Sequence, residues 1–406
     1  MSTLNKKLIK ILLILWPMPS DSNLILKKLS EITIKMDDSW KIFALKGSLP
    51  KHFTKFRLPC PNEFHQVNMY GYQKSIISRM SYFINCILKG VKLVKEENID
   101  VITQHDGHLT YGMVAYIISR LTHRKCLIRV NEDTLIPLVF FLRASDNYVF
   151  KSKTILSIVA FAYRRMEVAF FKHVDWVVTH GPMDYQKIKR LTNRITFVPL
   201  WVDVKKFKRF DEEAIQKLRE KFVSTKNVKI LLFVGRLHPE KGVPTLLKAL
   251  KLVKNMKILL LMIYSISEYR KDYEKLAEHL KISDKIRFIG YVHNDELPKY
   301  YNIADLYVLP SIREEWSNTL MEAMACKTPV IVTEVGGNPY LVIEGKTGFL
   351  VPPKDPVSLA QKIEFVLENP YLAMRVAEVA AKKIEIYDKD KIGESYKTVV
   401  KNLIRI

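Results

Sequence analysis

Residues 229–249 read KILLFVGRLHPEKGVPTLLKA, and this stretch decides the fold class of the chain. An apolar run ends in Gly235-Arg236, a short turn carries Lys241, and a helical pattern begins near Val243. A strand, a tight turn and a helix in this order indicate one βαβ unit of a parallel sheet. Gly235 lets the backbone turn sharply, and Arg236 and Lys241 lie beside a helix amino end, which attracts anions. A guanidinium next to an ammonium predicts a diphosphate site.

The same alternation of short apolar runs and longer helical patterns continues along the whole chain. Strands are expected at Ile9–Leu15, Val101–Gln104, Leu127–Val130, Trp176–Thr179, Ile195–Val198, Lys229–Val234, Ile258–Ile263, Ile286–Ile289, Leu306–Leu309 and Val330–Thr333. Helices are expected at 74–97, 111–121, 245–253, 269–279 and 318–325. This pattern predicts an α/β fold with parallel, doubly wound sheets.

The strands form two series, which predicts two Rossmann-like domains facing each other across a cleft. The first domain is expected at residues 1–205, joined by a C-terminal helix at about 389–406. The second domain is expected at residues 206–388, after the charged stretch that follows Asp203. Ligands bind beyond the carboxyl ends of the strands in such folds, so the cleft is the expected site.

A second polar loop follows the expected strand Leu306–Leu309 and reads PSIREEWSNTLMEAMAC over residues 310–326. Glu314 lies in the loop, and Glu322 lies eight residues later, about one turn into a helix. Carboxylates accept hydrogen bonds from paired hydroxyls, so these two predict contacts to two different polyols. Backbone N–H groups near the start of the helix can point at an oxygen-rich ligand. The residues that carry these N–H groups are Trp316, Ser317, Asn318 and Thr319.

Together these elements resemble the retaining, nucleotide-sugar-dependent glycosyltransferases of family 4, which have the GT-B fold. The resemblance covers nearly all of the second half of the chain. It is carried by GRLHPEKG (235–242), the Glu314–Glu322 spacing with EAMAC after it, PVI (329–331), TEVGG (333–337) and GKTGFLV (345–351). The fold that this resemblance implies is the pair of facing Rossmann-like domains expected above.

The resemblance also implies roles for the residues of the donor site. Arg236 and Lys241 would bind the donor diphosphate and stabilise its charge as the leaving group. Glu322 would hold the ribose diol, and Glu314 would contact hydroxyls of the donor sugar. Tyr291, in the loop after the strand Ile286–Ile289, would lie near the nucleoside base. The base is expected to be uracil, because UDP-sugars are the commonest donors in the family.

The first half of the chain matches that family less well. The loop after the first strand, residues 17–22, contains no glycine, and Asn131 stands where a catalytic-site histidine often occurs in the family. His105 and His108 follow a strand end and are the alternative catalytic candidates, with His180 at the next strand end. The residues alone do not rank these histidines.

The chain is strongly basic, which bears on its partners. It has 406 residues with a formal net charge of +23, and residues 1–205 alone carry 31 basic and 16 acidic residues. Such a charge attracts anionic lipids, phosphorylated ligands or nucleic acid. No nucleic-acid motif accompanies it, so a nucleic-acid partner is not expected. An equally open interpretation is a general excess of lysine spread over the whole surface.

One segment, Leu156–Val174, combines aromatic and aliphatic residues with the basic pair Arg164-Arg165. Lys151, Lys153 and Lys172 lie nearby. This composition predicts an amphipathic helix at an anionic membrane surface, and a core-packing helix with a basic edge is the alternative. We therefore expect a cytoplasmic enzyme that is peripheral on the inner face of the cell membrane. No stretch has the length and apolar character of a membrane-spanning helix.

The expected function is transfer of a sugar from a nucleotide-sugar to a lipid-linked or polysaccharide acceptor, with retention of configuration. No cofactor is expected, and no metal either, because no Asp-x-Asp element stands at the end of an apolar strand. Two other classes stay open. One is a glycosyltransferase with a soluble acceptor or a GT-B sugar-nucleotide epimerase. The other is a non-catalytic protein that binds a sugar-nucleotide or nucleic acid.

Overall fold

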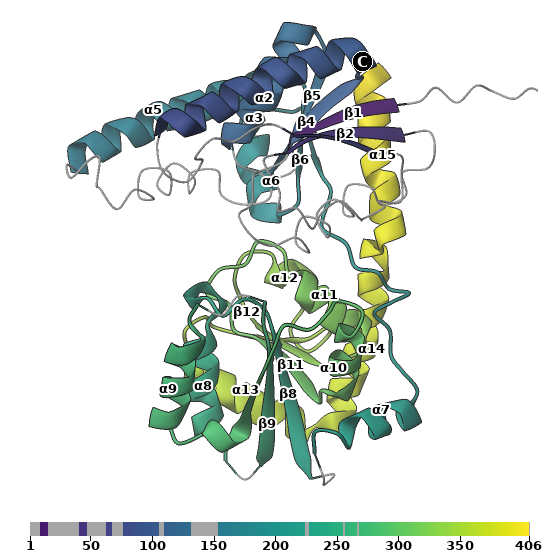
Figure 1. Cartoon of the computed structure of the whole chain (residues 1–406). Coiled ribbons are helices and arrows are strands. Elements are labelled where there is room, and N and C mark those ends of the chain that lie inside the picture. The colour runs from purple at the N-terminus through teal and green to yellow at the C-terminus, as the bar shows by residue number, and fades with distance from the viewer. Residues whose placement is uncertain are drawn as a thin grey trace, which may run out of the picture. The chain divides into compact units, whose positions relative to one another are not determined.

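The structure of the chain is a computed structural model, and it divides into two compact units (Figure 1). It describes residues 9–14, 40–46, 62–66, 76–104, 109–130, 153–223, 227–254, 256–265 and 268–405. The first unit consists of Met1–Val198 and Gly393–Ile406, and the second unit of Pro199–Ile392. The second unit is therefore inserted into the sequence of the first.

The first unit contains a seven-stranded sheet in which the described strand pairs are parallel. Across the sheet the strands are β3 (Asn62–Gln66), β2 (Trp40–Lys46), β1 (Ile9–Ile14), β4 (Val101–Gln104), β5 (Lys125–Val130), β6 (Trp176–Thr179) and β7 (Ile195–Phe197). The chain proceeds outward from β1 to β3 and then returns to place β4 beside β1. This reversal makes the sheet doubly wound.

Helices pack on this sheet through apolar faces. They are α2 (Ile76–Glu97), α3 (Leu109–Thr122), α5 (Lys153–His173), α6 (Pro182–Lys189) and most of α15 (Lys389–Arg405). Phe170 and Phe171 of α5 are buried in the core, and the ring of Phe170 meets the ring of Tyr116 of α3 edge-on at 5.6 Å. Gly112 of α3 lies against Phe170, where an added Cβ would be 3.2 Å from the ring. The absence of a side chain at Gly112 leaves room for the Phe170 ring.

The second unit contains a six-stranded sheet, again with parallel pairs. Across it the strands are β10 (Ile286–Gly290), β9 (Lys257–Ile263), β8 (Val228–Val234), β11 (Leu306–Leu309), β12 (Val330–Thr333) and β13 (Phe349–Val351). The chain runs outward from β8 to β10 and then returns to β11, which pairs with β8. The switch point of this sheet therefore lies between β8 and β11.

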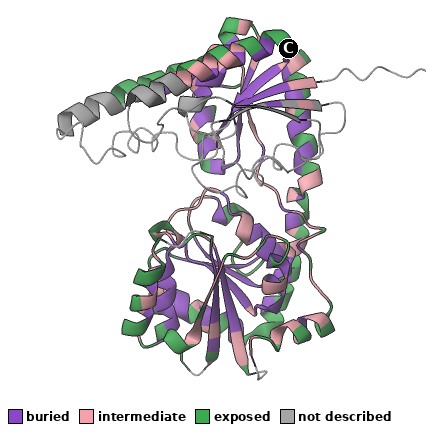
Figure 2. Ribbon diagram, viewed as in Figure 1, coloured by how far each residue is buried: buried purple, intermediate pink, exposed green. Residues whose placement is uncertain are grey.

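Helices cover both faces of the second sheet, and its strands are buried along most of their length (Figure 2). The helices are α7 (Glu212–Arg219), α8 (Val243–Leu252), α9 (Arg270–His279), α10 (Leu297–Ile303), α11 (Asn318–Ala325), α12 (Asn338–Leu341), α13 (Pro356–Glu368) and α14 (Pro370–Ile384). Short 3-10 turns occur at η2 (Pro239–Lys241), η3 (Ser283–Lys285) and η4 (Glu385–Tyr387). Strands that are buried on both faces need continuous apolar runs, such as Ile230–Val234, and these are the runs that the sequence shows.

The predicted α/β fold with two doubly wound parallel sheets is confirmed. The strands Val101–Gln104, Leu306–Leu309 and Val330–Thr333 and the helix Asn318–Ala325 begin and end at the predicted residues. The sequence analysis did not predict β2, β3 or β13, which all lie at or next to a sheet edge. β13 has only three residues and β3 reads NEFHQ, so neither presents a long apolar run.

The first turn of the long helix α15 belongs to the second unit, and the rest of the helix belongs to the first. It begins in the second unit and continues into the first, where Tyr396, Val400 and Leu403 are buried. The domain boundaries expected from sequence are at 205/206 and 388/389, and the units divide after Val198 and after Ile392. Residues 199–205 and 389–392, which were expected in the first domain, therefore belong to the second unit.

The helix α5 covers most of the expected amphipathic segment, and the burial of its side chains differs along its length. Phe170, Phe171 and Val174 are buried in the first unit, so this end is core and cannot form a membrane-facing surface. Phe161 and Met166 are 64% and 43% exposed. No helix in the described part of the chain combines the length and the apolar character needed to cross a membrane.

A buried polar group stands at the carboxyl end of the first sheet. His180 follows β6 and is only 4% exposed, and its Nε2 accepts hydrogen bonds from Arg129 Nε (3.1 Å) and Nη2 (2.9 Å). Its proton is therefore on Nδ1, which donates to the Val198 carbonyl at 2.6 Å. The Arg129 guanidinium also lies over the Tyr396 ring of α15 at 5.5 Å. Burial, and then the charge of Arg129, lower the pKa of His180 to about 3.

This histidine predicts that the first unit loses stability in acid. In the unfolded chain His180 binds a proton below its ordinary pKa of 6.5, whereas the folded chain resists this down to about 3. Its contribution is therefore complete above pH 6.5 and falls by about 1.4 kcal/mol per pH unit between 6.5 and 3. Amide hydrogen exchange of β6 peptides measures this slope. In His180→Gln the slope should be smaller by this amount, and an unchanged slope would contradict the argument.

Candidate functional site

The predicted donor residues gather at the switch point of the second sheet. The loops that follow β8 and β11 leave adjacent strands, because Leu231 pairs with Leu306 and Leu232 with Tyr307. The chain continues from these two strands in opposite directions across the sheet, which makes this carboxyl edge the switch point, where ligands bind in folds of this kind. Arg236 and Lys241 lie in the first loop, and Glu314 lies in the second.

The two loops are fastened together through the backbone. The Ile312 N–H donates to the Glu240 carbonyl at 2.7 Å. Gly242 has a φ of +67°, and an added Cβ would be 1.8 Å from the Pro310 carbonyl oxygen. Only glycine fits this position, because a side chain there meets backbone atoms that cannot move aside. The final glycine of the GRLHPEKG element therefore holds the two loops in contact.

Lys241 and Glu314 form an ion pair across the two loops. Lys241 Nζ lies 2.7 Å from Glu314 Oε2, and the two side chains are 16% and 10% exposed. The same carboxylate oxygen accepts a hydrogen bond from the Ser311 hydroxyl at 2.9 Å. An ammonium has three donors, so Lys241 can keep this pair and still donate to a ligand oxygen. The pairing fixes the position of a lysine whose side chain would otherwise have many rotamers.

The backbone of Glu314 is held by a third loop, which follows β12. The Gly337 N–H donates to the Glu314 carbonyl at 3.1 Å. An added Cβ at Gly336, whose φ is +52°, would be 1.4 Å from that carbonyl oxygen, and one at Gly337 would be 2.1 Å from the Glu315 carbonyl. The two glycines of TEVGG therefore let this loop pack directly on the backbone beside the site.

The helix α11 carries the remaining candidates of this loop. Ser317 is its N-cap and accepts a hydrogen bond from the Leu320 N–H at 3.3 Å, as expected for a serine at this position. The Thr319 hydroxyl accepts from the Tyr307 hydroxyl at 2.8 Å. Asn318 and Trp316 lie on either side of the cap, with Trp316 only 6% exposed. Because β11 and β8 are parallel neighbours, the start of α11 lies at the same carboxyl edge of the sheet as the turn after β8.

Glu322 lies inside the unit and not on an open surface. It is 5% exposed, and its Oε2 accepts a hydrogen bond from the Tyr301 hydroxyl of α10 at 2.8 Å. Burial, and then the charge of Glu322, raise the pKa of Tyr301 well above its ordinary value, so Tyr301 remains a donor. Tyr301, Tyr307 and Ser311 therefore support the site, and the sequence analysis missed all three. A tyrosine in an apolar helix or strand carries no signal that separates it from ordinary core.

Two further candidates, Arg236 and Tyr291, are not part of the Lys241–Glu314 ion pair. Arg236 is exposed directly after β8, and Tyr291 is 57% exposed after β10. Gly290 precedes Tyr291 with a φ of +89°, where the pairing of β10 with β9 shifts register. β9 lies between β8 and β10. Tyr291 therefore lies at the same carboxyl edge of the sheet as the loop after β8, but two strands away from it.

The candidates of the first half mostly lie outside the described residues. His105, His108 and Asn131 are in this group, as is the loop at residues 17–22. His180 is described, and its hydrogen bonds to Arg129 and Val198 occupy both ring nitrogens. His180 therefore links the carboxyl end of β5 to the residue that follows β7.

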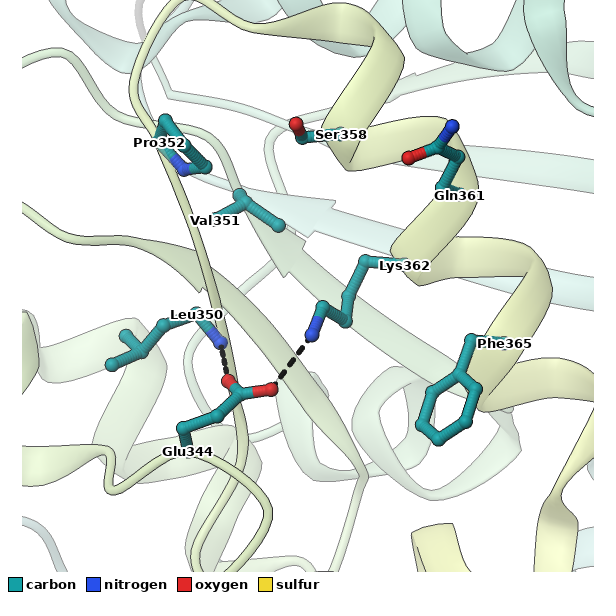
Figure 3. Close-up of a pocket in the computed structure, with 8 residues that line it drawn as sticks. All are labelled: Glu344, Leu350, Val351, Pro352, Ser358, Gln361, Lys362 and Phe365. Carbon is teal, nitrogen blue, oxygen red and sulfur yellow. Dashed lines mark hydrogen bonds and ion pairs between the residues drawn. The ribbon is translucent and has the colours of Figure 1, made fainter.

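A separate hollow of about 510 Å³ lies between β13 and α13 (Figure 3). Its charged groups already pair with each other, since Lys362 Nζ lies 2.7 Å from Glu344 Oε1 and the Leu350 N–H donates to the other carboxylate oxygen. None of the predicted donor residues lines it. Across the described residues, no three or more His, Cys, Asp or Glu side chains are grouped so that they could hold a metal ion.

Comparison with known proteins agrees with this geometry. Residues 214–383 match the family model described as "Glycosyl transferases group 1". An uncharacterized glycosyltransferase of Methanocaldococcus jannaschii is 34% identical over 174 residues, which are 43% of this chain and 45% of that protein. A D-inositol 3-phosphate glycosyltransferase of Corynebacterium glutamicum is 32% identical over 195 residues, 46% of this chain and 47% of that protein. The match thus spans about half the length of these curated relatives.

The fold is similar over a longer stretch. The Anabaena HepE structure in complex with UDP and glucose superposes with a TM-score of 0.73 at 18% identity, covering 97% of this chain and 100% of that one. This similarity identifies the fold of the two units as that of GT-B glycosyltransferases. Residues 214–383 hold Arg236, Lys241, Glu314 and Glu322. The match to the glycosyl transferases group 1 model therefore lies entirely within the second unit and includes the candidate donor residues.

Proposed function

We propose that the chain transfers a sugar from a nucleotide-sugar donor, with the donor bound at the switch point of the second unit. The observation that carries this proposal is the Lys241–Glu314 pair, which is 2.7 Å long and nearly buried, beside the exposed Arg236. A cation and a carboxylate held together at the carboxyl edge of a sheet can bind the two chemically different parts of a sugar diphosphate. The phosphates meet Lys241 and Arg236, and the hydroxyls meet Glu314.

The proposed chemistry is stabilisation of the leaving group. Breaking the bond between the anomeric carbon and the phosphate oxygen leaves the electron pair on the diphosphate. Arg236 and Lys241 would stabilise this developing charge, and the N–H groups at the start of α11 would add their dipoles. Retention of anomeric configuration is part of the proposal and rests on the resemblance to the family.

UDP is the proposed nucleotide of the donor. HepE, which has a similar fold, is described in complex with UDP and glucose. In the present chain the base would lie beside Tyr291, whose ring is 57% exposed and would stack on the planar base. Glu322 would hold the ribose, with its carboxylate oriented by the Tyr301 hydroxyl.

The proposed acceptor is lipid-linked or polymeric, reached at an anionic membrane surface. The support is local and lies on α5, where Phe161, Arg164, Arg165 and Met166 are all exposed within two turns. The Arg165 guanidinium lies 5.3 Å from the centre of the Phe161 ring, which keeps the aromatic and the charge on one face. An apolar ring beside cations is the composition of an interfacial helix. The enzyme would then act at the cytoplasmic face of the membrane.

The diphosphate assignment predicts a loss of turnover in two variants. Arg236→Ala and Lys241→Met should each lower the rate of UDP-sugar hydrolysis about 100-fold or more, because each removes a donor to the leaving group. Lys248→Ala, at an exposed lysine of α8, is the matched control and should keep the wild-type rate. Rates near wild type in both site variants would rule the assignment out.

A second prediction concerns metal ions. Because Arg236 and Lys241 supply the positive charge, hydrolysis of the donor should continue in excess EDTA. The measurement is the rate before and after chelation, followed by addition of Mg²⁺ or Mn²⁺. Loss of activity that either ion restores would show that the side chains are insufficient.

A third prediction concerns the membrane. The protein should bind vesicles that contain anionic lipid, and the binding should weaken as salt is raised. Arg164→Glu with Arg165→Glu should lower the affinity about 30-fold or more, at about 1 kcal/mol for each cation removed. Lys271→Glu with Lys275→Glu, at exposed lysines of α9, changes the net charge equally and should have little effect. If wild type does not bind anionic vesicles at low salt, the proposed membrane surface is wrong and a soluble acceptor is favoured.

A further inference from the structure

The two connections between the units are fastened to each other inside the second unit. The chain enters this unit at Pro199 and leaves it at Ile392. Shortly after the first point and before the second, Val202 N–H donates to the Tyr387 carbonyl at 3.0 Å, and Lys389 N–H donates to the Val202 carbonyl at 2.9 Å. We call residues 202–206 and 385–390 the linker clasp.

Side chains reinforce the linker clasp. Asp388 is 7% exposed, and its Oδ2 accepts from the Val204 N–H at 3.4 Å. Lys389 pairs with Asp203, and Lys205 Nζ lies 3.0 Å from Asp390 Oδ2. Two segments about 185 residues apart in sequence are therefore joined by both backbone and charge. Covalent connection of the two units alone does not require these hydrogen bonds and ion pairs.

One edge of the linker clasp touches the loop that carries Glu314. The ring of Tyr387 meets the indole of Trp316 edge-on, with centroids 5.4 Å apart and planes at 70°. An added Cβ at Gly337 would lie 3.1 Å from Cε3 of the same indole. Trp316 is 6% exposed, so its ring has little room to move. Tyr387 and the β12 loop therefore fix the residue that stands between Glu314 and the start of α11.

The other edge of the linker clasp touches the loop after β10. The ammonium of Lys206 contacts the side chains of Asn294 and Asp295, which follow Tyr291 by three and four residues. Lys206 is 24% exposed, and Asp295 is 69% exposed. The linker clasp thus contacts both loops that the proposed function assigns to the donor, one through an aromatic pair and one through an ion pair.

We propose that Tyr387 and Lys206 are positioning residues for the nucleotide-sugar, which act through the two donor loops without touching the donor. This inference rests on the proposed function. A site works only when its N–H groups and side chains are held to within a fraction of an ångström of the ligand, and loops need support to achieve this. Tyr387 supplies it to the loop of Glu314, and Lys206 supplies it to the loop of Tyr291.

The test is the affinity of the full chain for UDP, measured by calorimetry well below the melting temperature. Tyr387→Ala should weaken UDP binding about tenfold or more, because Trp316 loses the ring against which it packs. Tyr387→Phe keeps that ring and should bind within about twofold of wild type. Tyr371→Ala removes a tyrosine that is 86% exposed on α14, and it should change nothing. Lys206→Met should weaken UDP binding through the other loop and is independent of the aromatic pair.

The outcomes separate this inference from the proposed function. If wild type binds none of UDP, GDP and ADP, the donor site itself is wrong and the inference falls with it. If wild type binds UDP and both Tyr387→Ala and Lys206→Met bind it equally well, only the positioning role is overturned. A purely structural role for Tyr387 would lower the melting temperature of Tyr387→Ala and leave the UDP affinity of the folded protein unchanged. Weaker binding in Tyr387→Ala with recovery in Tyr387→Phe is the result that supports the role.

Discussion

The site of the second unit depends on how closely two backbones approach at Gly242. The hydrogen bond from Ile312 N–H to the Glu240 carbonyl forms because nothing projects from Gly242 toward Pro310. Without that contact the loops after β8 and β11 would separate, and Lys241 would have no fixed position relative to Glu314. A mostly buried ion pair stabilises the fold only when its geometry is fixed well enough to offset the cost of desolvating both charges. Here the backbone contact at Gly242 fixes the two loops that carry the pair.

The charges of this candidate site are balanced in the same way within the unit itself. Lys241 is balanced by Glu314 before any ligand arrives, so the isolated unit does not bury a lone cation. Arg236 stays in solvent, where its charge costs little. A diphosphate would bring the negative charge that these cations attract, and the carboxylate would then be available to hydroxyl groups.

Sequence predicted the local structure of the two candidate loops, which depends on backbone chemistry. Glycine at a strand end and a serine before a helix have direct physical meanings, so the loops at Gly235 and Ser317 were located correctly. The supporting tyrosines were not found, since Tyr301 and Tyr307 follow the apolar pattern of their helix and strand and act only through tertiary contacts. The edge strand β3 was missed for a related reason, because NEFHQ has no apolar alternation. The linker clasp joins residues far apart in sequence, and no local pattern reveals such a pairing.

The insertion of one unit within the other also sets the order in which the protein can be completed on the ribosome. The residues of α15 that fill the first unit, Tyr396, Val400 and Leu403, are synthesised only after all of residues 199–392. The second unit is continuous and can fold as soon as it emerges. Until then the first unit lacks these buried side chains, and Arg129 lacks the ring of Tyr396. During synthesis, therefore, the half of the chain that is made first is the half that is completed last.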